Sequence, residues 1–179
     1  MATLTDLYNR VNAQLEENLD LSYVTDVINE AYFLLAKQAR LEKTATLSVI
    51  TGVQDYSLPS DLLILRNVLK GDELFTDFQI WNNVFHLIEV PSTNFDLTLQ
   101  YYYKPARLVN PNDVPALPEI FHDLLVFYAC YKYKLRDEDT DLALQYLSQF
   151  SSGTQALKEY VSGKVEAPNA DFSSFTWER

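Results

Sequence analysis

Residues 117–161 read LPEIFHDLLVFYACYKYKLRDEDTDLALQYLSQFSSGTQALKEYV, and this stretch decides the fold because it holds two helical patterns separated by an acidic turn. Pro118 stands where a proline suits the first turn of a helix. Apolar side chains then recur at helical spacing until the run 136–141 (RDEDTD) interrupts them. They resume at Leu142 and continue to Tyr160. The pattern predicts a two-helix hairpin whose apolar faces pack in a larger helical assembly.

The first 42 residues predict a second pair of helices. Thr3 and Asp6 have the spacing of a helix cap, and apolar residues follow at helical intervals from Leu4 to Leu15. After a break near residue 20, Ser22 is the expected N-cap of the next helix. Amphipathic helices also bind membranes or partners, but the polar faces here carry acids and few lysines. We therefore expect both apolar stripes to be buried in a core.

Residues 43–117 change to the two-residue period of β-strands. The segment 44–51 (TATLSVIT) alternates and is rich in β-branched residues, and further strands are expected at 73–75, 78–81, 84–90 and 97–103. Residues 62–69 (LLILRNVL) are nearly all apolar, which predicts a strand buried on both faces. The proline-containing segment 104–117 predicts an extended connection back to the helices.

These segments together give an α+β fold class. We predict a four-helix bundle, made of two N-terminal and two C-terminal helices, with a central antiparallel β insertion and an extended C-terminal tail. The expected domains are a helical pair over residues 1–42, a β insertion over 43–117, a helical hairpin over 118–162 that completes the bundle, and the tail over 163–179.

Composition and charge exclude several functions. The 179 residues are 47% hydrophobic and 22% charged, which fits a folded domain. The formal net charge is −11 and no basic run occurs, so conventional nucleic-acid binding is disfavoured. An acidic wall would let a duplex slide past, although solubility alone explains the charge equally well. The four glycines match no phosphate-binding loop.

Three features of the sequence bear on the cellular location of the protein. Cys130 is the only cysteine, so no disulfide forms within the chain and a reducing compartment is the natural fit. The N-terminal residues lack the pattern of a signal peptide. The apolar runs are shorter than the roughly 20 residues of a membrane helix. We expect an intracellular protein without a membrane partner.

Catalytic and metal-binding signals are weak. Glu119 and His122 have the Glu-x-x-His spacing of di-iron bundles, but such sites need a second pair that is absent here. His86 has no evident partner, and Cys130 within an aromatic face suits a buried, unreactive thiol. The acids of run 136–141 lie in an expected exposed turn, without the burial that raises a catalytic pKa. We expect no enzyme, no metal and no cofactor.

Aromatic residues are the stronger signal. Tyr101, Tyr102 and Tyr103 are consecutive in a predicted strand, so Tyr102 should face away from its neighbours. Packing or subunit contact is favoured over base stacking, because few positive charges lie nearby. The tail concentrates its aromatic residues at Phe172, Phe175 and Trp177, which favours an ordered contact over a frayed end.

The sequence resembles the head–tail connector (adaptor) proteins of tailed bacteriophages. The resemblance lies in residues 56–62 (YSLPSDL) at the start of the β region, in residues 117–125 (LPEIFHDLL) at the start of the second helical pair, and in the order of the segments. It implies a structural virion protein that forms a ring, typically of twelve copies, under the portal. The ring would bridge the portal to the tail or its stopper, with DNA passing through its channel without sequence-specific binding.

The resemblance further implies a place in the neck of the virion, and in the host cytoplasm during assembly. On the same basis Phe172, Phe175 and Trp177 are expected to contact the portal or a neighbouring subunit. Three alternatives stay open. They are another phage neck or tail-completion protein, a small acidic regulatory protein that binds a host factor, and a hydrolase with an unrecognised site.

Overall fold

Helix α1 (Leu4–Leu15) begins at the predicted cap. The Thr3 hydroxyl accepts a hydrogen bond from the Asp6 backbone N–H, and the Asp6 carboxylate accepts one from the Thr3 backbone N–H. This reciprocal arrangement satisfies two backbone donors that a helix start leaves free. The buried residues Leu4, Leu7 and Val11 confirm the predicted apolar stripe.

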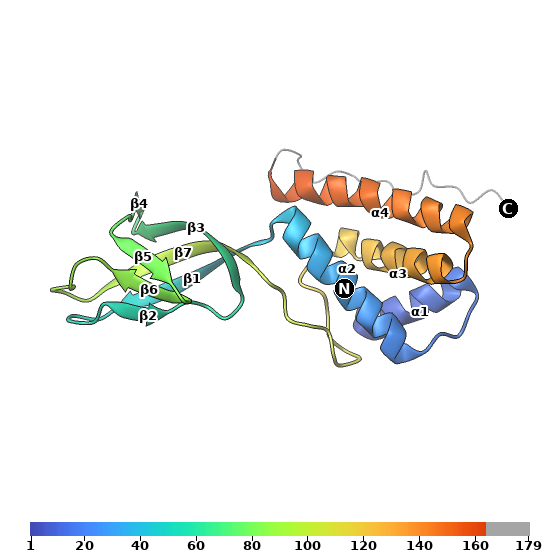
Figure 1. The fold of residues 1–179 in the computed structure, drawn as a ribbon, viewed down its shortest axis with the longest axis horizontal. Coiled ribbons are helices and arrows are strands. Elements are labelled where there is room, and N and C mark those ends of the chain that lie inside the picture. The colour runs from blue at the N-terminus through green and yellow to red at the C-terminus, as the bar shows by residue number, and fades with distance from the viewer. Residues whose placement is uncertain (164–179) are drawn as a thin grey trace. The chain divides into compact units, whose positions relative to one another are not determined.

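The computed structural model describes residues 1–163, and the chain divides into two compact units, one of Met1–Ala39 with the segment from Pro105 onward and one of Arg40–Lys104 (Figure 1). The remaining helices are α2 (Leu21–Ala39), the 3-10 turn Glu119–Phe121, α3 (Asp123–Arg136) and α4 (Thr140–Val161). The strands are β1 (Glu42–Val49), β2 (Asp55–Ser57), β3 (Leu62–Lys70), β4 (Glu73–Leu74), β5 (Phe78–Trp81), β6 (Val84–Leu87) and β7 (Phe95–Tyr103).

In the helical unit, α3 packs against α1, α2 and α4. Its buried face includes Leu124, Leu125 and Cys130, which are at most 2% exposed. Helix α2 begins one residue before the expected cap Ser22, because the Asp20 side chain, an equally good N-cap, accepts the Tyr23 backbone N–H at 3.1 Å.

The segment 105–117 is fastened to the helical unit by buried hydrogen bonds. Asn29 of α2 is 1% exposed, and its side-chain Nδ2 donates to the Leu108 carbonyl at 2.9 Å. Its Oδ1 accepts the Leu108 N–H at 2.8 Å. The Tyr32 hydroxyl accepts the Ala116 N–H, and the Asp113 carbonyl accepts the N–H of Leu4. The segment therefore has a fixed course over α1 and α2.

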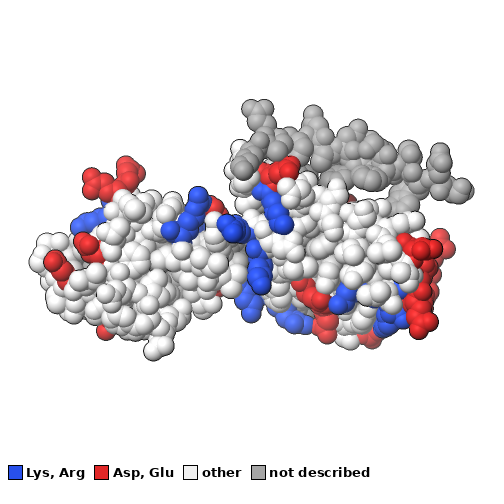
Figure 2. All heavy atoms as spheres, turned by 45° about the horizontal axis from the view of Figure 1, so that its top comes forward, with Lys and Arg blue, Asp and Glu red and all other residues white. Residues whose placement is uncertain are grey.

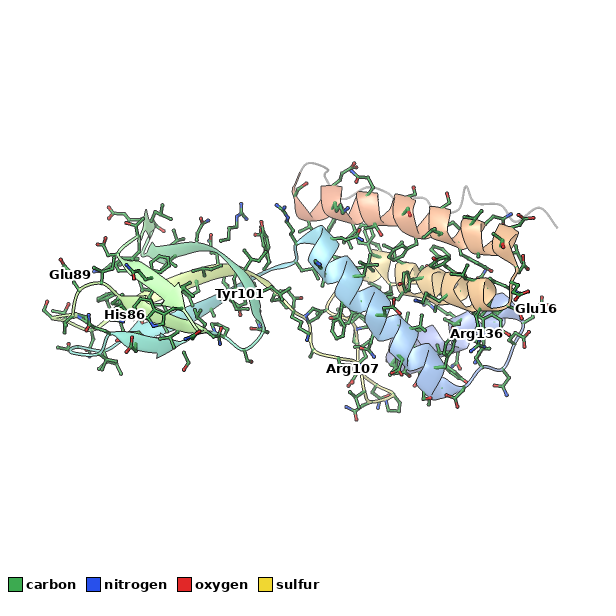
Figure 3. The ribbon with its side chains drawn as sticks, viewed as in Figure 1. Glu16, His86, Glu89, Tyr101, Arg107 and Arg136 are labelled. Carbon is green, nitrogen blue, oxygen red and sulfur yellow. The ribbon has the colours of Figure 1, made fainter. Side chains whose placement is uncertain are left out.

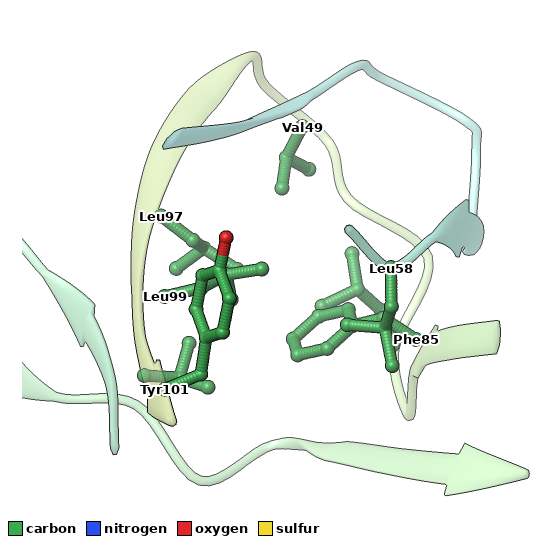
Figure 4. Close-up of a cluster of buried hydrophobic side chains, with 8 residues drawn as sticks. Val49, Leu58, Phe85, Leu97, Leu99 and Tyr101 are labelled. Carbon is green, nitrogen blue, oxygen red and sulfur yellow. The ribbon is translucent and has the colours of Figure 1, made fainter. Parts of the chain in front are cut away.

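In the β unit, two antiparallel sheets face each other. Sheet order is β1-β7-β3-β4 in one and β2-β6-β5 in the other. Leu97, Leu99 and Tyr101 point inward from β7, and Phe85 and Leu87 point inward from β6. Figure 4 shows most of the resulting core, which consists of Val49, Leu58, Val68, Phe85, Leu87, Leu97, Leu99 and Tyr101.

Strand β3 is not buried on both faces, contrary to the prediction. Val68 is its one buried residue, and Leu63 and Ile64 are 47% and 61% exposed. The reason lies in the sheet, which has a core on one side only and borders β3 with a β4 of two residues. Ile64, opposite Tyr102, lies on the outer face of this sheet, where apolar side chains remain accessible, and Leu63 lies at a register shift between β3 and β7.

The predicted four-helix bundle with a central β insertion is wrong, although the mixed α+β class is right. The structure has four α-helices and a region of seven antiparallel strands in the part of the chain that it describes. The helices α1, α2 and α4 all pack against α3, and a groove lies between α1 and α4. The strands form two sheets with a core of their own. Helical periodicity shows which face of each helix is buried but not which helix covers it.

Within residues 1–163, none of the helices combines the length and the apolar character that crossing a bilayer requires.

Candidate interaction surfaces

The residues that carry chemistry in the sequence are separated in the structure. Cys130 is fully buried, and burial raises the pKa of its thiol to about 12. Glu119 is exposed and forms an ion pair with the N-terminal amino group at 2.6 Å. His122 is 1% exposed, and its Nε2 lies 3.0 Å from the Leu117 carbonyl oxygen. Glu119 and His122 therefore do not form a shared ligand pair, and no cluster of His, Cys, Asp and Glu suited to a metal occurs among the described residues.

His86 has a partner that sequence analysis missed. Its Nδ1 lies 2.6 Å from Oδ1 of Asp55, which is directly opposite on the neighbouring strand. The His86 ring also lies 4.6 Å from the ring of Trp81, centroid to centroid, on the outer face of the sheet. The contact could not be predicted from local sequence patterns, because Asp55 and His86 are 31 residues apart in the sequence. Among the described residues, no hydroxyl or thiol is hydrogen-bonded to the other ring nitrogen of His86.

The three consecutive tyrosines are part of the packing of the β unit. Tyr101 is buried, and its hydroxyl donates to Asp61 at 3.0 Å. Lys43 lies 2.6 Å from the same carboxylate and, with Tyr101, lowers the pKa of Asp61. Tyr102 faces the opposite side, where Arg40 lies 5.8 Å from its ring. Figure 3 shows Tyr101 within the strands.

An apolar tip is the first surface that suits a partner. We use this name for the exposed side chains of loops 50–54 and 88–94, namely Ile50, Val53, Ile88 and Val90, which are 39–59% exposed. The two loops leave β1 and β6, so the tip lies at the end of β1 and β7 opposite to where the chain enters and leaves the β unit. Glu89, labelled in Figure 3, lies among them.

Hydrogen bonds hold the apolar tip in one shape. The Gly52 N–H donates to the Pro91 carbonyl at 2.9 Å, and the Thr51 N–H donates to Asn94 Oδ1 at 2.8 Å. The Tyr56 hydroxyl accepts the Ile50 N–H at 3.0 Å and donates to the Val53 carbonyl at 2.8 Å. A preformed apolar surface loses little conformational entropy on binding, which favours a role in protein contact.

The second surface is the α1/α4 groove, a hollow of about 640 Å³ in the helical unit. Ile120, Leu124 and Phe127 form its apolar floor. Its walls combine small residues with charged and polar ones. The small residues are Ala13 on α1 and Ser152, Gly153 and Ala156 on α4, and the others are Gln14, Glu16 and the ion-paired Arg10 and Asp123. The Oε1 atom of Gln149, which also lines the groove, is shielded from solvent and has no hydrogen-bond partner among the described residues.

The third surface is an acidic end of the helical unit (Figure 2). Here Arg136 at the end of α3 lies 4.5 Å from the ring of Tyr23 near the start of α2, so the α1–α2 and α3–α4 connections meet. Glu16 and Arg136 are labelled at this end in Figure 3. The acidic residues of the two connections and of the start of α4 are Glu16, Glu17, Asp20, Asp137, Glu138, Asp139 and Asp141, and most are exposed. This confirms the exposed acidic turn that the sequence predicts.

The predicted contact residues Phe172, Phe175 and Trp177 lie outside the described residues.

Comparison with known proteins identifies one family. Residues 2–171 match the model of the SU10 adaptor protein family, a range that includes both compact units. No curated protein matches the chain.

Proposed function

Since this chain belongs to the SU10 adaptor protein family, it is a phage adaptor protein, and we propose that it forms an oligomeric ring that bridges the capsid portal to the tail or its stopper. The main support for this proposal is the family match over residues 2–171. The match also bears out the resemblance to head–tail connector proteins. In the proposed assembly the ring has about twelve copies, related by one repeated heterologous contact.

A bridging protein needs two separate contact surfaces, and the chain offers candidates for both. We assign the apolar tip of the β unit to the next tail component, because it is exposed, apolar and held in shape by its own hydrogen bonds. We assign Phe172, Phe175 and Trp177 of the C-terminal segment to the portal or a neighbouring subunit. Aromatic side chains bury large areas at low entropic cost, which suits such contacts.

The charge supports a channel through which DNA passes without being bound. A protein that holds DNA neutralises phosphates with basic side chains. This chain has 14 basic and 25 acidic residues. We further propose that the protein acts without an enzymatic step, in the host cytoplasm during assembly and in the neck of the finished virion.

Native mass spectrometry of the purified protein, alone and mixed with the cognate portal, tests the ring. A ring-sized species in either condition supports the proposal and reports the copy number. A monomer or dimer that ignores the portal would contradict it and would favour a regulatory protein.

Removing residues 163–179 tests the C-terminal contact. We expect weaker attachment to the portal and an unchanged circular dichroism spectrum, because helix α4 ends at Val161. Attachment that is as strong as that of the full chain would exclude these aromatic residues from the contact.

A further inference from the structure

We propose that the free edge of β1 pairs with the same edge of a second copy of this chain. The pairing is antiparallel, with Thr44 of one copy opposite Thr46 of the other, so a two-fold axis relates the two copies. A ring is closed by a heterologous contact, which a two-fold pairing is not. The inference therefore goes beyond the proposed ring and concerns the protein before its copies enter one.

The backbone groups on this edge are the first support. β1 is the outermost strand of its sheet and has β7 as its one neighbour there. The Tyr103 N–H donates to the Leu41 carbonyl, so the odd-numbered residues of β1 direct their N–H and C=O groups at β7. The groups of the even-numbered residues point away from the sheet, and no backbone group of the described residues pairs with them. These exposed residues are Glu42, Thr44, Thr46 and Ser48.

The open part of the edge ends after Ser48. Ile50, the next even-numbered residue, donates its N–H to the Tyr56 hydroxyl at 3.0 Å. Its carbonyl accepts the Val53 N–H at 3.1 Å. The same edge is thus satisfied within the chain at Ile50 and open from Glu42 to Ser48.

The second support is that β1 lacks the features that prevent edge pairing. Folded proteins protect a free strand edge with prolines, charged side chains, bulges or a short strand. β1 has eight residues, no proline and an uninterrupted register with β7. Its two charged residues, Glu42 and Lys43, stand at its start and are ion-paired with Arg66 and Asp61. The opposite edge of the sheet differs, because β3 has two register shifts and is bordered by β4.

The third support is that the open edge is complementary to itself. With Thr44 opposite Thr46, Glu42 lies opposite Ser48 of the second copy, so every open backbone group gains a partner. Shifting the register in either direction places Ser48 or Glu42 opposite a residue outside the open edge. Threonines that face each other across two strands attract, and in this register no like charges are opposed.

The pairing also covers apolar surface. Ala45 and Leu47 pack against the core of the β unit but are only partly buried. A strand added beside β1 reduces their exposure to water, which is favourable. A strand of another protein would form similar backbone hydrogen bonds, but the match of the edge to itself favours a second copy.

Hydrogen exchange of single backbone amides, measured by NMR on the full chain, tests the pairing. We expect the amides of Thr44, Thr46 and Ser48 to exchange about tenfold more slowly in concentrated than in dilute protein. The amides of Ala45 and Leu47 face β7 and should exchange slowly in both, which makes them internal controls. Fast exchange of the first set at every concentration would overturn the proposal. Slow exchange in a species of 20.6 kDa would also overturn it, because the edge would then be covered within one chain.

Charge substitutions test the register. One variant combines Thr44→Lys with Thr46→Lys, and the other combines Thr44→Glu with Thr46→Glu. Both positions are exposed, so both variants are expected to fold. Within each variant like charges oppose each other, so association should weaken by about tenfold or more. An equimolar mixture places Lys opposite Glu and should regain, by light scattering, twice the mass of 20.6 kDa of one chain.

A matched control adds the same charge elsewhere on the β unit. Thr76→Lys with Gln79→Lys changes two exposed positions outside β1, and this variant should associate like the parent. A Thr44→Lys, Thr46→Lys variant that associates as strongly as the parent would overturn the proposal. A mixture of the two β1 variants that stays monomeric would overturn it as well.

Discussion

At the scale of single residues, Asn29 attaches the segment 105–117 to α2, a role that the sequence alone does not indicate. It stands in a largely apolar helix, where an amide is normally unfavourable. Its side chain instead satisfies both the N–H and the carbonyl of Leu108 inside the helical unit, and also donates to the Thr25 carbonyl. The segment 105–117 thus depends on one buried amide for its attachment to α2.

We predict that Asn29→Ala destabilises the helical unit. The substitution leaves two buried backbone groups of Leu108 unpaired, and each costs about 1–3 kcal/mol. Urea unfolding followed by far-UV circular dichroism measures the loss. Gln38→Ala, at an exposed position of the same helix, should stay within about 0.5 kcal/mol of the parent. A similar effect of both substitutions would assign no special role to Asn29.

At the scale of elements, the contact between α3 and α4 depends on Gly153. A Cβ atom built at this glycine would lie 2.2 Å from Cδ2 of Leu124, which is buried at 2% exposure. The missing side chain therefore lets the two helices approach closely. The same absence helps to open the α1/α4 groove, which Gly153 also lines.

We predict that Gly153→Ala destabilises the helical unit in spite of its better helix propensity. Overpacking costs about 1–3 kcal/mol, and the propensity gain of about 1 kcal/mol offsets only part of it. In a Leu124→Ala background the clash is gone, so the same substitution should become stabilising. A double-mutant cycle by urea unfolding measures this reversal, and additive effects would disprove the proposed clash. Ser152→Ala, one position away and exposed, is the control and should not destabilise.

The sequence predicts individual elements better than their contacts. The cap at Thr3 and the apolar stripe of α1 follow from local spacing, and both are confirmed. The four-helix bundle is wrong because helical periodicity shows which face of a helix is buried and not which element covers it. The fit of Gly153 against Leu124, which lie 29 positions apart, is a contact of this kind. Likewise, Asp55 and His86 meet only through the register of β2 and β6. A pattern within one segment carries no information on such pairings.

At the scale of the whole molecule, the two units give the chain separate cores. The buried cluster of the β unit draws only on residues between Val49 and Tyr101. The apolar tip belongs to this unit, so a surface change there leaves the helical core untouched. Its proposed contact with the tail can therefore be tested without disturbing the rest of the protein.

We predict that Val90→Asp blocks the addition of the next tail component to the portal-bound protein. The substitution places a charge in an apolar contact, and Val90 is exposed, so folding and binding to the portal should persist. Cosedimentation of portal complexes with tail components measures the loss. Ile64→Asp adds the same charge at an exposed site of β3, which pairs with the end of β7 opposite the tip, and this variant should retain addition. Equal addition by both variants would remove the tip from this contact.

The β unit begins and ends at neighbouring positions, since the Tyr103 N–H donates to the Leu41 carbonyl at 3.1 Å. A segment whose two ends adjoin can be exchanged for another of different size without rerouting the flanking chain. Modular replacement of this kind would let one helical scaffold acquire new tail specificities by recombination. Grafting the β unit of a relative between residues 40 and 104 is thus a practical route to engineered particles with altered tails.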